Sequence, residues 1–275
     1  MDLGLENKVA LVAGGSSGIG LAAAKEFARE GAYVAICGRD PDRLAEAERA
    51  IKEVARGRVD VSSVDVTDER AAVRWVDEVA AEFGALHILL VSGGSPPIGT
   101  ASRFEVAEYR SAVDRILLPA VSLALAALPH LKAAGWGRLL FVASETASVP
   151  IGPLALSGVT RAAIVRFAQA LAADLGRDGV TVNVLAPGGV RTPPMERAAA
   201  KLAGDGDVEA QLRVMGHHSA IGRLARPEEV AAVAAFLAST RASFVTGGVH
   251  LIDGGAGVVG PDLPHLTAAR KDTYT

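Results

Sequence analysis

Val12-Ala13-Gly14-Gly15-Ser16-Ser17-Gly18-Ile19-Gly20 is the stretch that decides the fold of this 275-residue chain. An apolar run, 8–13, leads into it and a helix-forming run, 21–29, leads out of it, so the order is strand, glycine turn, helix. The glycines allow a tight turn and a close approach to a ligand, and the unpaired amides at the start of the helix favour a phosphate. The stretch therefore predicts a dinucleotide site, although its Gly-x-x-x-Gly-x-Gly spacing differs from the commonest Gly-x-Gly-x-x-Gly fingerprint.

Apolar runs and helical patterns alternate along the rest of the chain. The expected strands are 8–13, 33–37, 59–64, 87–91, 137–143, 180–185 and 248–252. The expected helices are 18–30, 41–55, 68–82, 104–133, 155–176 and 227–238. Because the strands are separated by helices and read as continuous apolar runs, we expect right-handed crossovers and strands buried on both faces. The predicted fold class is α/β: a single-domain Rossmann fold with a doubly wound, mainly parallel seven-stranded sheet and helices on both faces.

The composition fits one large domain and excludes several function classes. Half of the residues are hydrophobic and the formal net charge is only −3, which gives no indication of a nucleic-acid or membrane surface. The single cysteine, Cys37, cannot form an internal disulfide, so we expect a cytoplasmic protein in which this thiol is a small core residue. The first residues do not resemble a signal peptide, and apolar runs such as 116–128 are too short to span a membrane.

Two regions depart from the regular alternation. Residues 188–218 are rich in Gly, Pro, Ala and Met, which is typical of a mobile lid over a site, or of an ordinary surface loop with a short helix. After Gly255 the chain becomes polar and contains two prolines, so we divide it into a domain over 1–255 and a C-terminal extension over 256–275.

Taken with Asp65-Val66-Thr67 after the third strand, the glycine spacing resembles that of the short-chain dehydrogenase/reductase family. The resemblance extends from about residue 5 to Gly255, nearly the whole chain. It implies an oxidoreductase that binds NAD(H) or NADP(H) and acts on the alcohol or carbonyl group of a small molecule. It also implies a homo-oligomer, dimer or tetramer, because the helices that match 104–133 and 155–176 pair across a two-fold axis in that family.

The end of the second strand favours NADP(H) over NAD(H). A site for NAD usually has a carboxylate there, which binds the ribose 2′-hydroxyl and would repel a 2′-phosphate. Here Gly38 stands at that position and Arg39 follows it, and a guanidinium can bind a phosphate with two parallel hydrogen bonds. The alternative is a solvated loop arginine. Asp40 is expected to cap the next helix, ahead of Pro41.

The resemblance implies that the remaining cofactor contacts lie in the loops after the strands. The glycine turn would hold the phosphates with Gly14, Ser16, Ser17, Gly18, Ile19 and Gly20. Asp65 and Val66 would hold the adenine, the alternative for Asp65 being a helix cap. Ser92, Gly93 and Gly94, where the family usually has Asn-Asn-Ala-Gly, would approach the nicotinamide ribose. A second loop would cover the nicotinamide and matches the family pattern Pro-Gly-x-Val-x-Thr, with Pro187, Gly188, Val190 and Thr192.

The family's usual catalytic set is Asn, Ser, Tyr and Lys, and three of these four positions differ in this chain. Ser144 matches the serine, at the end of the fifth strand. The tyrosine position holds Ser157, the lysine position Arg161 and the asparagine position Ile116. A serine hydroxyl is a much poorer acid than a tyrosine, and an arginine does not release its proton, although it can still bond ribose hydroxyls.

Glu145, beside Ser144, is the best alternative acid or base, unless it is a carboxylate that faces solvent at the end of a strand. The catalytic candidates are therefore Ser144, Glu145, Ser157 and Arg161, with no metal. The leading hypothesis is an NADP(H)-dependent oxidoreductase with a degenerate catalytic set. The alternatives are an NADP(H)-binding protein with little turnover, acting as a sensor or assembly partner, and a lyase or isomerase that uses the same pocket.

Overall fold

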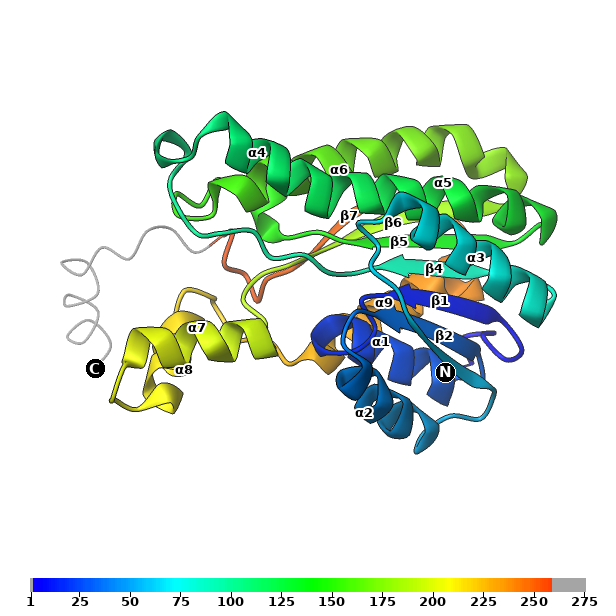
Figure 1. Cartoon of the computed structure of the whole chain (residues 1–275), viewed down its shortest axis with the longest axis horizontal. Helices are drawn as coiled ribbons and strands as arrows, with labels where there is room; N and C mark the ends of the chain where they lie inside the picture. Colours follow the sequence, from blue (N-terminus) through cyan, green and yellow to red (C-terminus); the bar gives the residue numbers. More distant parts are fainter. Residues whose placement is uncertain (1, 259–275) are drawn as a thin grey trace, which may run out of the picture.

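A parallel sheet runs through the centre of the molecule in the computed structural model, which describes residues 2–258. Its strands are β1 (Val9–Ala13), β2 (Tyr33–Gly38), β3 (Val59–Ser63), β4 (Ile88–Val91), β5 (Gly137–Val142), β6 (Val180–Pro187) and β7 (Val249–Ile252). They pair in the order β3-β2-β1-β4-β5-β6-β7, and every pair in this described part of the chain is parallel (Figure 1). The predicted seven-stranded Rossmann sheet is confirmed, and it is wholly rather than mainly parallel.

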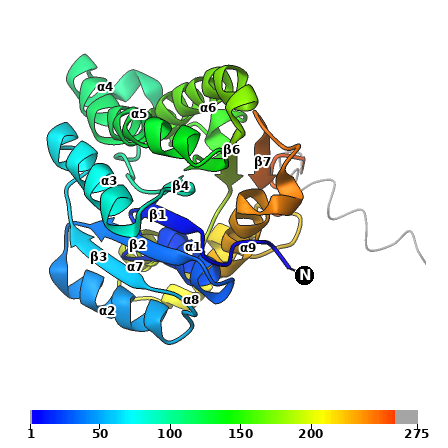
Figure 2. The same ribbon diagram turned by 90° about the vertical axis from the view of Figure 1, so that its right-hand side faces the viewer.

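Helices cover both faces of this sheet, as the doubly wound pattern predicts (Figure 2). One layer contains α1 (Gly18–Arg29), α2 (Pro41–Lys52) and α9 (Pro227–Ala238), and the other contains α3 (Glu69–Phe83), α5 (Leu118–Ala133) and α6 (Ala155–Leu175). Successive strand residues face opposite layers: Leu11 packs in the core under α3, α5 and α6, and Val12 packs in the core under α1, α2 and α9. β1, β5 and β6 are therefore buried at every position, whereas the edge strands β3 and β7 are only partly buried.

Local sequence signals set where several helices begin. The carboxylate of Asp40 accepts hydrogen bonds from the backbone N–H groups of Asp42 and Arg43, and Pro41 occupies the first turn of α2, as predicted. Asp68 caps α3 in the same way by accepting from the N–H of Ala71. Cys37 is a buried core residue of β2, and burial raises the pKa of its thiol to about 12.

The helix expected over 104–133 is divided. It begins as α4 (Val106–Ala112), passes through a π-helical turn, η2 (Val113–Leu117), and continues as α5. The whole segment, Val106–Ala133, is long and apolar enough to cross a membrane by length and composition, a test that the core helix of a soluble protein also passes. One such helix is weak evidence for a span, and α5 packs on α3, β4 and β5.

The region over 188–218 forms two helices, α7 (Pro193–Ala203) and α8 (Val208–Gly216). Arg191, which precedes them, donates hydrogen bonds to Glu196 on α7 and to Glu209 on α8. The sequence left a choice between a lid and a loop with a short helix, and the observed arrangement is a helical pair tied to the end of β6. Most of the extension expected over 256–275 lies outside the described residues.

Short helical turns complete the elements: η1 (Ala101–Arg103), η3 (Glu145–Ala147), η4 (Gly176–Asp178) and η5 (Thr240–Ala242). The carboxyl ends of the parallel strands meet at one edge of the sheet, which is where ligands bind in folds of this kind. All the loops that the sequence singled out start from this edge.

Candidate active site

The glycine turn between β1 and α1 is packed so closely that side chains do not fit. A Cβ atom on Gly14 would lie 2.1 Å from the carbonyl oxygen of Ser92, and one on Gly20 would lie 2.2 Å from the carbonyl oxygen of Gly14. Gly14 also has φ of +73° and Gly18 has φ of +55°, which favour glycine. Gly14 thus packs the turn against the loop that follows β4, and Gly20 packs the start of α1 against the turn itself.

The N-terminus of α1 lacks a cap. Ser17 occupies the cap position, but its side chain accepts no hydrogen bond from the first turn and no acidic residue lies in that turn. The starts of α2 and α3 have aspartate caps instead. Several N–H groups of α1, from Gly18 onward, therefore face the open edge without a side-chain acceptor, which is the donor set that a pyrophosphate requires.

The region beside the end of β2 contains a hydroxyl and a guanidinium, and a side chain at position 38 would have to displace the hydroxyl of Ser16. A Cβ on Gly38 would lie 2.9 Å from the Oγ of Ser16. Arg39 is exposed and forms no ion pair with any residue among 2–258. It is near enough to Asp65 to help lower the pKa of that carboxyl, so Ser16, Arg39 and Asp65 surround the same part of the open edge.

Asp65 is not a helix cap, because Asp68 fills that role for α3. Its carboxylate accepts hydrogen bonds from the N–H and the hydroxyl of Thr67, at 3.0 and 2.8 Å. The bond from the Thr67 N–H is the main reason that the pKa of Asp65 lies below its usual value. The next residue, Val66, lines a small cavity of about 50 Å³ together with Gly93, Arg115 and Ile116.

Three hydroxyl residues meet where β5 ends. Ser144 caps the short η3 turn, and its Oγ accepts a hydrogen bond from the N–H of Thr146 at 3.2 Å. The hydroxyl of Thr146 lies 3.1 Å from the hydroxyl of Ser157 on α6. The structure thus brings the two candidate serines together through a buried threonine that sequence reasoning missed. A second hydroxyl two residues after Ser144 was the available signal.

Glu145 lies half-buried next to the turn after β6, and it does not simply face solvent. One of its carboxylate oxygens is 3.1 Å from the point where a Cβ on Gly188 would lie. Burial raises the pKa of Glu145, and the nearby carboxylate of Asp253 raises it further. Asp253, which the sequence marks only as a structural match, is therefore part of the electrostatics of this site.

Arg161 points from α6 into the protein. Its side chain is buried, and its Nη atoms donate hydrogen bonds to the backbone carbonyls of Val142, Gly93 and Gly94 at 3.1, 2.8 and 2.7 Å. Burial lowers the pKa of this guanidinium to about 10. Ile116 is also buried beside this loop and presents no polar group.

The loop over 187–192 is fixed by the returning chain. Pro187 pairs with Ile252 of β7, and Val190 forms a parallel bridge with Ala225. Thr192 stands against the glycine turn, since a Cβ on Gly18 would lie 3.1 Å from its methyl group. The five cofactor loops named from the sequence thus lie side by side at one edge.

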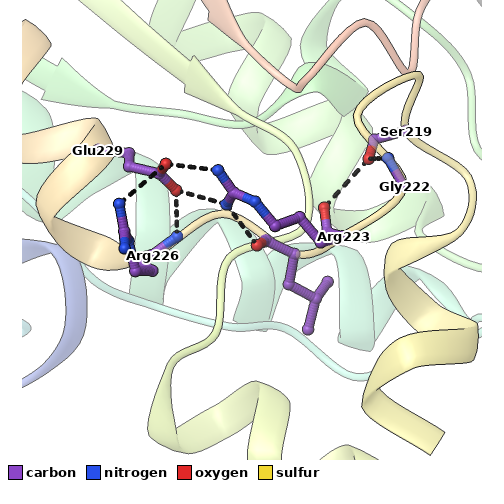
Figure 3. A network of polar contacts seen from close by, with 6 residues as sticks. Ser219, Gly222, Arg223, Arg226 and Glu229 are labelled. Carbon is purple, nitrogen blue, oxygen red and sulfur yellow. Dashed lines mark hydrogen bonds and ion pairs between the residues drawn. The ribbon is translucent and has the colours of Figure 1, made fainter. Parts of the chain in front are cut away.

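Figure 3 shows the polar network that holds the segment before α9, which includes Ala225. Arg223 forms two hydrogen bonds with the carboxylate of Glu229, at 2.8 and 2.7 Å, and the N–H of Arg226 donates to the same carboxylate. The hydrogen bond from the Arg223 guanidinium is the main reason that the pKa of Glu229 falls to about 2. Ser219 accepts from the N–H of Gly222 and donates to the carbonyl of Arg223. This network keeps Ala225 in register with Val190.

No cluster of side chains that could bind a metal ion occurs in the part of the chain that the structure describes.

Comparison with known proteins agrees with this geometry. The family model described as enoyl-(acyl carrier protein) reductase matches residues 13–257. Among curated proteins, cis-4-hydroxycyclohexanecarboxylate dehydrogenase of Sinomonas cyclohexanicum is 35% identical over 249 residues, which cover 90% of this chain and 96% of the relative. The L-fucose dehydrogenase of Mus musculus is 34% identical, over 90% of this chain and 88% of its own length.

The solved structures include one very similar to this chain. L-sorbose reductase from Gluconobacter frateurii, crystallised with NADPH and L-sorbose, superposes with a TM-score of 0.90 and 34% identity, over 94% of this chain and all of that one. The family match spans nearly the whole chain, and these relatives are named as dehydrogenases or reductases of alcohols and carbonyls. The chain is therefore an oxidoreductase that belongs to the short-chain dehydrogenase/reductase family.

Proposed function

We propose that this protein transfers hydride between NADP(H) and the carbonyl or alcohol group of a small molecule. The observation that carries the proposal is the uncapped start of α1, which faces the same open edge as Ser144, Glu145 and Arg39. The L-sorbose reductase crystallised with NADPH supports the choice of cofactor by similarity. The single buried thiol, Cys37, supports a cytoplasmic location.

Each residue at the open edge has a separate role in the proposed reaction. When bound, the nicotinamide supplies or accepts the hydride. The first turn of α1 binds the pyrophosphate, and Ser144 donates a hydrogen bond to the substrate oxygen. Because Ser144 already accepts from the N–H of Thr146, its own proton is free for this donation. Glu145 holds the proton that reaches the oxygen, since its raised pKa keeps more of it protonated near neutral pH.

The test is NADPH oxidation by the purified protein with small ketones, cyclic ketones and ketoses. Sustained turnover with at least one of them supports the proposal. Tight NADPH binding with no oxidation by any of them would support a binding protein instead. Ile116 and Arg161 favour that second function, because a buried alkyl group cannot carry a proton and an arginine does not release one.

Arg39→Ala is expected to remove the preference for NADP(H). The guanidinium is exposed and has no carboxylate partner among residues 2–258, so it is free to bind the 2′-phosphate. Loss of one charge-assisted bidentate contact costs on the order of 1.5–3 kcal/mol, or roughly ten- to hundredfold in affinity. Titration of NADPH and NADH against wild type and variant measures it. Equal affinities of the wild type for both cofactors would refute the preference.

We also propose a homo-oligomer, formed through the outer sides of α5 and α6. Leu118 and Leu125 on α5 and Val159 on α6 have about half of their surface exposed, at 50%, 52% and 52%. Light scattering at micromolar concentration is expected to give at least twice the chain mass of 28.2 kDa, and Leu125→Glu is expected to lower it. A wild-type mass equal to that of one chain would contradict the assembly.

A further inference from the structure

We infer that Arg161 is a positioning residue that shapes the loop after β4, so that this loop can bind the nicotinamide ribose, and is not itself a ribose ligand. The inference rests on the proposed nucleotide function. It gives the position where the family usually has lysine a role in positioning a loop, in place of direct contact with the ribose. Three backbone carbonyl oxygens accept hydrogen bonds from the Arg161 guanidinium.

Both terminal nitrogens of Arg161 donate hydrogen bonds to backbone carbonyls of the protein. One Nη donates to the carbonyls of Gly93 and Gly94, at 2.8 and 2.7 Å, and the other donates to Val142 at 3.1 Å. Among residues 2–258, no carboxylate forms an ion pair with it. A buried guanidinium with carbonyl partners only is held by the fit of its planar N–H groups to those oxygens. A lysine ammonium is a single point donor and cannot reproduce this planar arrangement.

The loop conformation matches this role. Gly93 and Gly94 both have positive φ, +135° and +75°, and this turn directs their carbonyls inward. In a planar trans peptide the carbonyl oxygen and the following N–H point in opposite directions. The N–H groups of Gly94 and Ser95 therefore point away from Arg161, on a loop whose residues are exposed.

Neither of these N–H groups has a hydrogen-bond partner in the described part of the chain. They form a pair of backbone donors beside the glycine turn, since a Cβ on Gly14 would lie 2.1 Å from the carbonyl of the adjacent Ser92. Hydroxyl oxygens of the nicotinamide ribose are the acceptors that suit them. By binding the carbonyls of Gly93 and Gly94, Arg161 fixes the direction in which the N–H groups of Gly94 and Ser95 point.

The test compares a whole cofactor with its adenosine half. Arg161→Met and Arg161→Lys are both expected to weaken NADPH binding about tenfold or more, and to leave the affinity for adenosine 2′,5′-bisphosphate within about twofold. Arg39→Ala is the matched contrast, because it weakens both ligands. A general loss of structure would weaken both ligands too. An Arg161→Lys variant that binds NADPH as tightly as wild type would overturn the inference, because it would mean that a cation in contact with the ribose is sufficient.

A double-mutant cycle separates positioning from direct contact. Gly93→Ala adds no steric clash, since nothing lies within 4 Å of its Cβ, but it disfavours the left-handed turn. If Arg161 acts through the loop, the double variant binds NADPH no more weakly than the weaker single variant, to within about twofold. Additive losses would overturn the inference. Gly84→Ala, at a positive-φ helix end with equally open surroundings, is the control and is expected to leave NADPH affinity unchanged.

These measurements are independent of turnover. If NADH proves to be the tighter cofactor, the same cycle is run with NADH and AMP. Failure of the wild type to bind either nucleotide would refute the proposed function and this inference together, whereas binding without catalysis would leave the inference intact. If Arg161→Met does not fold, Arg161→Lys and Gly93→Ala still decide the outcome.

Discussion

Ser144→Ala is expected to lower the turnover of NADPH-dependent carbonyl reduction about 10²–10³-fold, the usual effect of removing one well-placed oxyanion donor. The Oγ of Ser144 accepts from the N–H of Thr146, which orients the hydroxyl and leaves its proton for the substrate. Alanine removes that donor and keeps the backbone. The measurement is the initial rate of NADPH oxidation at saturating cofactor, with the substrate that the wild type reduces fastest.

Two controls make the Ser144 result specific. NADPH affinity is expected to be unchanged, because we propose that the glycine turn, and not this hydroxyl, holds the cofactor. Ser148→Ala, at an exposed serine that follows the same η3 turn, is expected to leave the rate within about twofold, as surface substitutions usually do. Fast turnover that survives Ser144→Ala would show that the chemistry takes place elsewhere.

Glu145→Gln is expected to slow reduction by about 10²–10⁴-fold, the usual contribution of a general acid, and to flatten its pH profile. Burial and Asp253 raise the pKa of Glu145, so the protonated acid persists to a higher pH than in an ordinary glutamate. Reduction needs the protonated form. The wild-type rate should therefore be highest below this raised pKa and fall as the pH rises through it, and the reverse oxidation should show the opposite trend.

Asp253→Asn provides the matched control for Glu145. It removes a neighbouring negative charge. The N–H groups of Gly255 and Gly257 donate to different oxygens of the Asp253 carboxylate, and asparagine keeps one of these two acceptors. The pKa of Glu145 is then expected to fall, so the inflection in the reduction rate moves to lower pH with the maximum rate retained. A Glu145→Gln variant that keeps both the rate and the pH profile of the wild type would exclude Glu145 as the proton source.

The fold was predictable because its signals are local. The apolar run at 8–13 became β1 (Val9–Ala13), and Pro41 with Asp40 marked the start of α2. Continuous apolar strands separated by helices leave few topologies, and the handedness of crossovers reduces them further. The π-helical turn at Val113–Leu117 was not predictable in this way, because one extra residue in a helical turn leaves no mark on an apolar pattern this dense.

The candidate site was predictable as a set of loops but not as a set of contacts. The spacing predicted that Gly14, Gly38 and Thr192 belong to the site. It did not predict that they contact Ser92, Ser16 and Gly18, respectively, which belong to other loops. The bond between Thr146 and Ser157 joins two elements, and so do the bonds of Arg161 to the loop after β4. Such contacts depend on how helices are placed on the sheet, and no single window of sequence carries that information. The roles of Ser144, Glu145, Ser157 and Arg161 remain predictions.

The strand order also determines how the molecule can be built during synthesis. In the order β3-β2-β1-β4-β5-β6-β7, β2 and β3 add on one side of β1, and β4 to β7 then add in turn on the other side. No strand has to be inserted between two that are already paired, so each newly made segment finds a free edge as it leaves the ribosome. The glycine turn, which we propose as the phosphate site, belongs to the first unit made. The loop over 187–192 is fixed only when Ala225 and β7 have been made. With the cofactor in the proposed site, a nascent chain that stops before β7 would therefore contain the residues for the adenosine half before the loop for the nicotinamide half is fixed.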